Sequence, residues 1–216
     1  MQSQAILFDL DGTLLDSLGD IAGALNHTLG AFGLPQHEVD AYREFVGEGV
    51  EQLVDRALGV HAAAHRARVL PAYRAYYREH IAVHTVPYPG VGELLATLVA
   101  RGVPLCVLSN KPDDATRTLV ARFFGDTPFV QVAGHKADVP RKPDPTAALA
   151  MAAVLGVDPS YCAFVGDSNI DMQTAAAAGM RGVGVSWGFR GRAELEAYGA
   201  AAVIDEPAQL LAFIRP

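Results

Sequence analysis

Apolar residues gather in short runs along this chain, most of them followed by a polar residue or a glycine. Between the runs, apolar residues recur at helical spacing. Short apolar strands that alternate with helices are typical of a parallel sheet with helices on both faces. We therefore predict an α/β fold with a Rossmann-like parallel sheet as its core. The expected strands are 4–8, 103–108, 129–132, 161–165, 182–185 and 201–204, and the expected helices are 90–101, 113–123, 145–155, 169–178 and 192–198.

Residues 17–86 break this alternation, because they contain no strand-like run and show helical periodicity punctuated by proline and glycine. We expect an inserted all-helical cap domain here, with the core formed by residues 1–16 and 87–216. The chain would return to the core through residues 84–90. The expected cap helices are 17–32, 39–46, 50–58 and 62–82. The tyrosines at 73, 76 and 77 are expected to pack in the cap core or in an interface between two caps.

The composition fits an ordered globular protein that binds neither nucleic acid nor membranes. Half of the 216 residues are hydrophobic, 19% are charged and the net charge is −7. An acidic chain is a poor partner for nucleic acid or an acidic membrane surface, although a local group of cations can still bind a small anion. No apolar stretch approaches the roughly 20 residues that span a bilayer.

The cysteines and the first residues favour the cytoplasm. Cys106 and Cys162 both lie in apolar runs, so we expect buried thiols rather than a disulfide. The first residues lack a basic segment and reach Asp9 after a short apolar run, which is unlike a signal peptide.

The first candidate site is the pair Asp9 and Asp11, which directly follows the first expected strand. Open α/β sheets bind ligands at the carboxyl ends of their strands. Two carboxylates there repel each other, so a hard cation such as Mg²⁺ is their natural partner. A calcium-binding EF-hand loop does not fit, because Gly12 is the fourth residue of such a loop and Asp20, not glutamate, is the twelfth. Two turn-forming aspartates are the simpler alternative.

Two further segments offer groups that bind phosphate. Ser109 and Asn110 follow an expected strand, although both residues are also common in turns. Lys142 precedes an expected helix between Arg141 and Pro143, and it is one of three lysines in the chain. A rigidly held ammonium suits phosphate charge, while a surface lysine at a helix start is the alternative.

A second acidic segment, Gly166 to Asp171, follows another expected strand and begins a helix. Asp167 lies where it can join Asp9 around a metal ion. Asp171 can reach back as an outer acid that orients the ligands. An N-terminal helix cap is the alternative role for Asp167 or Ser168, and the two roles are compatible.

The four segments together resemble the haloacid dehalogenase-like hydrolases along essentially the whole chain. The resemblance rests on D-x-D-G-T from Asp9, on Ser109 and Lys142, and on G-D-S-x-x-D from Gly166. It implies that Asp9 attacks phosphorus and forms an aspartyl-phosphate, and that Asp11 is the general acid and base. It further implies that Ser109 and Lys142 stabilise the phosphoryl oxygens.

The metal ligands implied by the resemblance are Asp9, the main-chain carbonyl of Asp11, and Asp167, with Asp171 orienting bound water and Mg²⁺ as the cofactor. Thr13 and Asn110 are expected near the bound phosphate. Dehalogenases of the superfamily lack an acid at the position of Asp11, because a halide leaves without a proton. The presence of Asp11 therefore favours a phosphatase.

Within the superfamily the chain resembles the phosphoglycolate phosphatases, through DLDGTLLDS, the helical insertion, YREFVGEGVEQLVDRALG, PYPGV and the Trp187-Gly188 pair. This implies a phosphoric monoester hydrolase acting on 2-phosphoglycolate. Separately, we expect a monomer or homodimer. In the family, a cap loop near Gly47 closes over the substrate. Arg43 and Glu48 are therefore candidate selectivity residues, with a solvated helix break as the alternative.

Three alternatives remain at this stage. The same chemistry serves pyrophosphatases and phosphosugar phosphatases with similar caps. A non-catalytic phospho-acceptor, like a receiver domain, also carries an aspartate on a parallel α/β fold, but receivers are much shorter and have no such insertion. The i,i+4 histidine pairs His61–His65 and His80–His84 have zinc-site spacing, but no HExxH glutamate or third ligand accompanies them, so exposed helix histidines are expected.

Overall fold

Six parallel strands form the central sheet of the computed structural model, which describes residues 2–214. β1 lies inside the sheet and pairs in parallel with β4 on one side and β6 on the other. The strand order β5-β4-β1-β6-β7-β8 confirms the predicted α/β core. The strands span Ala5–Phe8 (β1), Leu105–Pro112 (β4), Gln131–His135 (β5), Cys162–Gly166 (β6), Arg181–Val185 (β7) and Ala202–Ile204 (β8).

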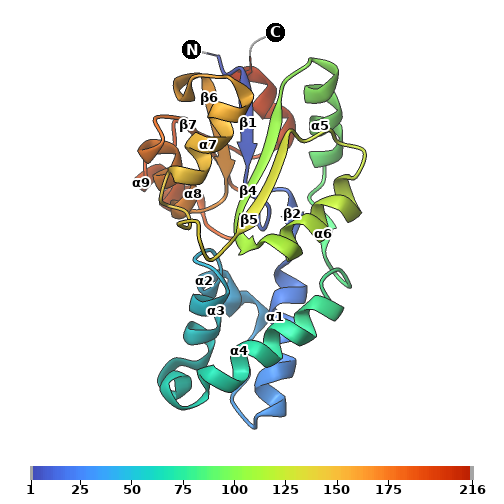
Figure 1. Cartoon of the computed structure of the whole chain (residues 1–216), viewed down its shortest axis with the longest axis vertical. Helices are drawn as coiled ribbons and strands as arrows, with labels where there is room; N and C mark the ends of the chain where they lie inside the picture. The colour runs from blue at the N-terminus through green and yellow to red at the C-terminus, as the bar shows by residue number, and fades with distance from the viewer. Residues whose placement is uncertain (1, 215–216) are drawn as a thin grey trace.

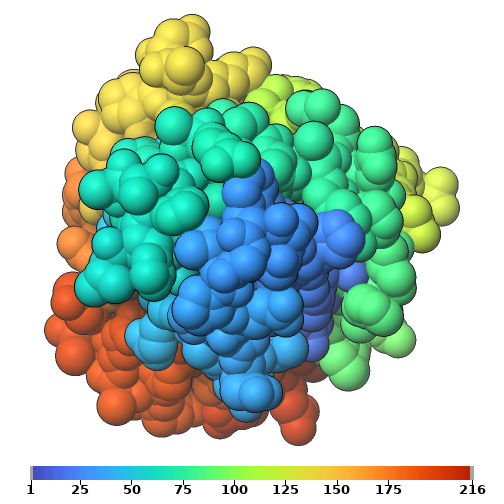
Figure 2. Space-filling model, turned by 90° about the horizontal axis from the view of Figure 1, so that it is seen from below, coloured from blue at the N-terminus to red at the C-terminus, as the bar shows by residue number. Residues whose placement is uncertain are grey.

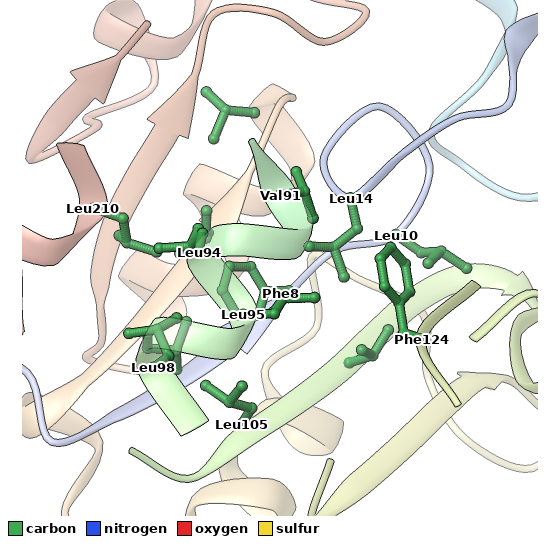
Figure 3. Packing of buried hydrophobic residues seen from close by; sticks show 14 of the residues in the cluster. Phe8, Leu10, Leu14, Val91, Leu94, Leu95, Leu98, Leu105, Phe124 and Leu210 are labelled. Carbon is green, nitrogen blue, oxygen red and sulfur yellow. The ribbon is translucent and has the colours of Figure 1, made fainter. Parts of the chain in front are cut away.

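Helices cover both faces of this sheet (Figure 1). They are α5 (Val91–Ala100), α6 (Asp113–Phe124), α7 (Thr146–Leu155), α8 (Asn169–Ala177) and α9 (Arg192–Ala197), with 3₁₀ helices η3 (Pro159–Tyr161) and η4 (Pro207–Phe213). Successive strand residues point to opposite faces. Ile6 and Phe8 accordingly pack with α5, α6 and η4, while Ala5 and Leu7 pack with α7 and α8. Figure 3 shows the first cluster around Phe8.

The helical insertion, residues 18–85, lies below the sheet and packs around its own apolar cluster (Figure 1). Seen from below, it occupies the middle of the molecule, and core segments surround it (Figure 2). Tyr73 and Tyr77 are buried in its cluster, as expected. Its elements are α1 (Leu18–Ala31), η1 (Val39–Ala41), α2 (Tyr42–Phe45), α3 (Val50–Leu58), η2 (Gly59–His61) and α4 (Ala62–Glu79).

Two chain segments join the insertion to the core. β2 (Leu15–Asp16) and β3 (Val86–Pro87) pair antiparallel as a short ribbon at the predicted boundary. Just inside it, the buried carboxylate of Asp20 accepts hydrogen bonds from the main-chain N–H groups of Val83, His84 and Thr85 and from the Thr85 hydroxyl, at 2.6–3.0 Å. The outgoing and returning chains are thus held together by one carboxylate.

Several element bounds differ from the sequence-based expectation. β4 begins at Leu105 and continues through Pro112, because its last residues pair with β5 across an irregular register. The expected helix 39–46 is instead a 3₁₀ turn followed by one turn of α-helix, and η4 was not anticipated. Within residues 2–214, no helix combines the length and apolar character needed to cross a membrane.

Candidate active site

Three strand ends bring the predicted site residues together. Asp9 follows β1 and its main-chain N–H donates to the Val165 carbonyl of β6 at 2.9 Å. Ser109 lies near the end of β4, and Asp167 directly follows β6. Because β4 and β6 are the two neighbours of β1, these residues meet at the carboxyl edge of the sheet, where open α/β folds bind their ligands.

Asp9, Asp167 and Asp171 form a buried acidic cluster whose carboxylate oxygens lie within 4.8 Å of one another. The Lys142 ammonium lies 2.9 Å from Asp9 Oδ1 and 2.7 Å from Asp171 Oδ1. One ammonium among three carboxylates leaves an excess of negative charge, and hard oxygen ligands of this kind fit Mg²⁺. In the described part of the chain this is the one such group of potential metal ligands, and it contains no histidine.

The ionisation of the cluster reflects its burial. Burial raises the pKa of Asp9 to about 7, against the opposing attraction of Lys142, and the Asp171 charge raises it further. Burial, together with Asp171 and Asp9, also raises the pKa of Asp167 well above its ordinary value. For Lys142, burial acts to lower the pKa, but the two neighbouring carboxylates outweigh it and the pKa is raised. Protons therefore compete with a cation at this cluster.

Neighbouring groups fix the orientation of the Asp167 and Asp171 carboxylates. Asp167 accepts a hydrogen bond from the Thr13 hydroxyl at 3.3 Å and one from the Phe189 N–H at 2.7 Å. Asp171 accepts from the Ser168 hydroxyl at 2.7 Å and the Ser168 N–H at 3.1 Å, as part of a capping box at the start of α8. The helix-cap role considered for Ser168 is thus present beside the acidic cluster.

Asp11 lies apart from this cluster. Its carboxylate oxygens are 2.9 and 3.0 Å from the Lys111 ammonium, and one of them accepts a hydrogen bond from Ser17 at 2.5 Å. The buried ammonium also lies 4.9 Å from the centre of the Tyr77 ring, which comes from the helical insertion. The Asp11 carboxylate is therefore paired with Lys111 and not with the acidic cluster, and its predicted metal contact would use the main-chain carbonyl.

Asn110 positions Lys142 through its side-chain amide. Asn110 Oδ1 accepts from the Lys142 N–H at 2.9 Å, and Nδ2 donates to the Lys142 carbonyl at 3.0 Å. Nδ2 also donates to the Gly47 carbonyl of the helical insertion at 2.9 Å. These main-chain contacts occupy the amide that the sequence suggested for substrate binding. Ser109 lines the adjacent cavity, and its hydroxyl accepts a hydrogen bond from the Lys111 N–H at 3.3 Å.

A cavity of about 620 Å³ lies between the sheet edge and the helical insertion. Its core wall carries acids and cations of the site, and its other wall is mainly apolar and aromatic. The core contributes Asp9, Asp11, Ser109, Lys111, Asp167 and Arg190, and the insertion contributes Ile21, Val50, Leu53, Tyr73, Arg74 and Tyr77, among others. The reacting end of a ligand would thus face the core.

Arg43 and Glu48, the two candidates for substrate selectivity, do not line the cavity. Arg43 donates to the Gly188 carbonyl at 2.9 Å and pairs with Asp40, and Glu48 pairs with Arg56. Among the described residues that line the cavity, neither is present. Arg43 thus contacts both the insertion and the core, whereas Glu48 forms its ion pair within the insertion.

Sequence reasoning gave no role to Lys111 or to the loop around Phe189. Lys111 shares a face with Ser109, because residues two apart in an extended strand point to the same side, but this placement depends on the continuation of β4 to Pro112. The contact of Phe189 with Asp167 has no local signature, since it depends on how the loop after β7 folds over the acidic cluster.

Comparison with known proteins agrees with this geometry. The family model for haloacid dehalogenase-like hydrolases matches residues 4–179. Phosphoglycolate phosphatase of Pseudomonas putida is 36% identical over 211 residues, covering 95% of this chain and 78% of its own. That of Rhodospirillum rubrum is 37% identical over 216 residues, covering 96% and 89%. A solved structure from Lactobacillus delbrueckii subsp. bulgaricus, described as a candidate phosphoglycolate phosphatase, has a TM-score of 0.92 at 33% identity over 100% of both chains. The chain belongs to the haloacid dehalogenase-like hydrolases.

Proposed function

We propose that this protein is a Mg²⁺-dependent phosphatase that works through an aspartyl-phosphate on Asp9 and hydrolyses 2-phosphoglycolate. The broader class, a phosphoric monoester hydrolase, follows from the family and from the relatives named above. The observation that carries the finer proposal is the placement of the Asp9 carboxylate on the cavity wall, held by Lys142 and beside Asp167.

The first step transfers the phosphoryl group to Asp9. Asp9 Oδ1 is held by Lys142 at 2.9 Å and by the Leu10 N–H at 2.7 Å, which fixes the rotation of the carboxylate and thereby the direction of its other oxygen. That carboxylate forms a bond to phosphorus while the bond from phosphorus to the ester oxygen breaks. The leaving oxygen takes a proton from the carboxylic acid of Asp11.

The second step releases phosphate. The Asp11 carboxylate accepts a proton from a water molecule, whose oxygen bonds to phosphorus as the bond to Asp9 breaks. Lys142 and the Ser109 hydroxyl stabilise the charge on the phosphoryl oxygens in both steps. Bound Mg²⁺, held by Asp9, Asp167 and the Asp11 carbonyl with Asp171 behind them, would neutralise the charge of the phosphate and the acids.

A small acidic leaving group is supported by the position of Lys111. Its ammonium contacts the Asp11 carboxylate, so it lies near the oxygen that Asp11 would protonate. A carboxylate close to the ester oxygen, as in 2-phosphoglycolate, could reach this ammonium. The names of the relatives point to the same substrate.

A larger leaving group is the second candidate, because a cavity of about 620 Å³ far exceeds the size of glycolate. A phosphosugar would fill more of the cavity, and the second phosphate of pyrophosphate could bind the cationic side chains that line it. The size of the cavity therefore favours a phosphosugar phosphatase of the same family, and the cations that line it favour a pyrophosphatase.

A phosphate-release panel with Mg²⁺ separates these candidates. It would include 2-phosphoglycolate, pyrophosphate, hexose phosphates and nucleoside monophosphates. We expect kcat/KM for 2-phosphoglycolate to exceed every other value by at least about tenfold, equal to about 1.4 kcal/mol of differential binding. A preference for a hexose phosphate or pyrophosphate would select the second candidate. Release from none of them would favour a phospho-acceptor without turnover.

A further inference from the structure

The loop after β7 links the helical insertion to the acidic cluster. Phe189 belongs to the core by chain position, yet its side chain is buried in the apolar cluster of the insertion, with 9% exposed. Leu18, Ile21 and Val46 belong to the same cluster. Phe189 therefore anchors a core loop in the insertion.

The main chain at Phe189 also contacts a predicted metal ligand. Its N–H donates to Asp167 Oδ2 at 2.7 Å. The loop lies tightly against Asp167 here, because a Cβ added at Gly188 would come within 2.2 Å of Asp167 Cβ and 2.3 Å of the Gly12 carbonyl oxygen. Trp187 fixes the other end of the loop, since its indole N–H donates to the Thr13 carbonyl at 3.1 Å.

Polar contacts in both directions hold this loop to the insertion. Arg43 donates from the insertion to the Gly188 carbonyl at 2.9 Å. Arg190 donates from the loop to the Arg43 carbonyl and, at 3.4 Å, to the Val46 carbonyl. The residues on either side of Phe189 are thus tied to the same short segment, residues 43–46.

We propose that Phe189 is a positioning residue that couples docking of the insertion to divalent-cation binding at Asp167. This inference rests on the proposed metal site. When the insertion holds the Phe189 ring, the Phe189 N–H is directed at Asp167 and keeps the carboxylate oriented for a cation. Because the coupling free energy is reciprocal, a cation bound at Asp167 stabilises the docked insertion by the same amount as docking strengthens cation binding.

The first test measures Mg²⁺ affinity by isothermal titration calorimetry, independently of activity. Phe189→Ala keeps the N–H but removes the anchor, and we expect Mg²⁺ to bind about tenfold more weakly, the usual scale for groups that orient metal ligands. Phe189→Leu, which keeps an apolar anchor, should recover most of the affinity and guards against a misfolded alanine variant. Phe32→Ala is the matched control, because Phe32 packs on the same cluster from the C-terminal end of α1. It should leave the affinity unchanged.

The second test follows the reverse direction by amide hydrogen exchange. In the wild type, Mg²⁺ should slow exchange in residues 43–46, and this slowing should be lost in Phe189→Ala. Equal Mg²⁺ affinity in Phe189→Ala and the wild type would overturn the coupling and leave the proposed phosphatase intact. The same conclusion would follow if Phe32→Ala weakened Mg²⁺ binding as much as Phe189→Ala does. A wild type that binds no Mg²⁺ would overturn the proposed metal site and the coupling together.

Discussion

Two aspartate–lysine ion pairs lie at the candidate active site. Asp9 pairs with Lys142 inside the acidic cluster, whereas Asp11 pairs with Lys111 on the side of the insertion. Two of the three lysines in the chain are thus committed to the site. In the proposed mechanism the pairs have different tasks, because the Asp9 carboxylate attacks phosphorus while Asp11 exchanges a proton.

The two aspartates should respond differently to the loss of charge. Asp9→Asn removes the attacking oxygen and should abolish turnover. Asp11→Asn should greatly slow hydrolysis yet still permit phosphorylation of Asp9, since an amide cannot activate the water of the second step. Mass spectrometry of protein quenched during turnover measures the phosphoenzyme. Normal hydrolysis by Asp11→Asn would exclude Asp11 as the general acid and base.

Lys111 should matter for catalysis but not for metal binding. Lys111→Met leaves Asp11 without its cation, and we expect kcat to fall by about 10²-fold, in the range of single acid–base contributions. Mg²⁺ affinity should not change, because Lys111 pairs with Asp11 and not with the acidic cluster. Lys111→Arg is the conservative control and should restore part of kcat. A parallel loss of Mg²⁺ affinity would contradict this separation of roles.

At the scale of elements, the sequence predicts the strands and strand ends that are marked by a local pattern of residues. The run AILF followed by two acids marked β1 and its carboxyl end, and the motif order placed Asp9, Ser109 and Asp167 on adjacent strand ends. The extension of β4 to Pro112 could not be predicted, because pairing with β5, not residue preference, keeps those polar residues extended.

The connection between core and insertion depends on Asp20. Its buried carboxylate accepts three main-chain N–H groups, and substituting alanine leaves those donors without a partner. Asp20→Ala should therefore lower the free energy of unfolding by about 2–3 kcal/mol, since a hydrogen bond to a buried charge contributes about 1.5–3 kcal/mol. Urea denaturation measures the change. Asp126→Asn, on an exposed turn, is the control and should have little effect; equal stability of the two variants would remove the assigned role of Asp20.

At the scale of the whole molecule, the sequence did not reveal how the helical insertion contacts the core. Arg43 and Glu48 both lie in the insertion, but only the direction of the Arg43 side chain depends on how the insertion docks on the core. Arg43 contacts the loop at Gly188, and Glu48 pairs with Arg56. The Arg43–Gly188 contact joins residues far apart in the chain, so neither spacing nor periodicity encodes it. The acidic cluster was predictable because each member follows a strand or begins a helix.

The stability of the whole protein should couple pH to Mg²⁺. The pKa of Asp9 is raised by burial from 3.8 to about 7, so the metal-free folded state binds more protons than the unfolded state between these values. The stability that these protons provide is fully present below the unfolded pKa and is lost as pH rises through about 7. Mg²⁺ replaces the protons, so the increase in Tm on adding Mg²⁺ should be larger at about pH 8 than at about pH 5.

Scanning calorimetry at both pH values, with and without Mg²⁺, measures this difference, and Asp167→Asn provides the internal comparison. That variant carries one carboxylate fewer in the cluster, so its metal-free form should lose less stability as pH rises, and Mg²⁺ should raise its Tm little at either pH. The carboxylates repel one another without a cation, and removing one relieves that repulsion together with the metal site. An equal Mg²⁺-induced increase in Tm at both pH values would show that proton and metal do not compete for the cluster.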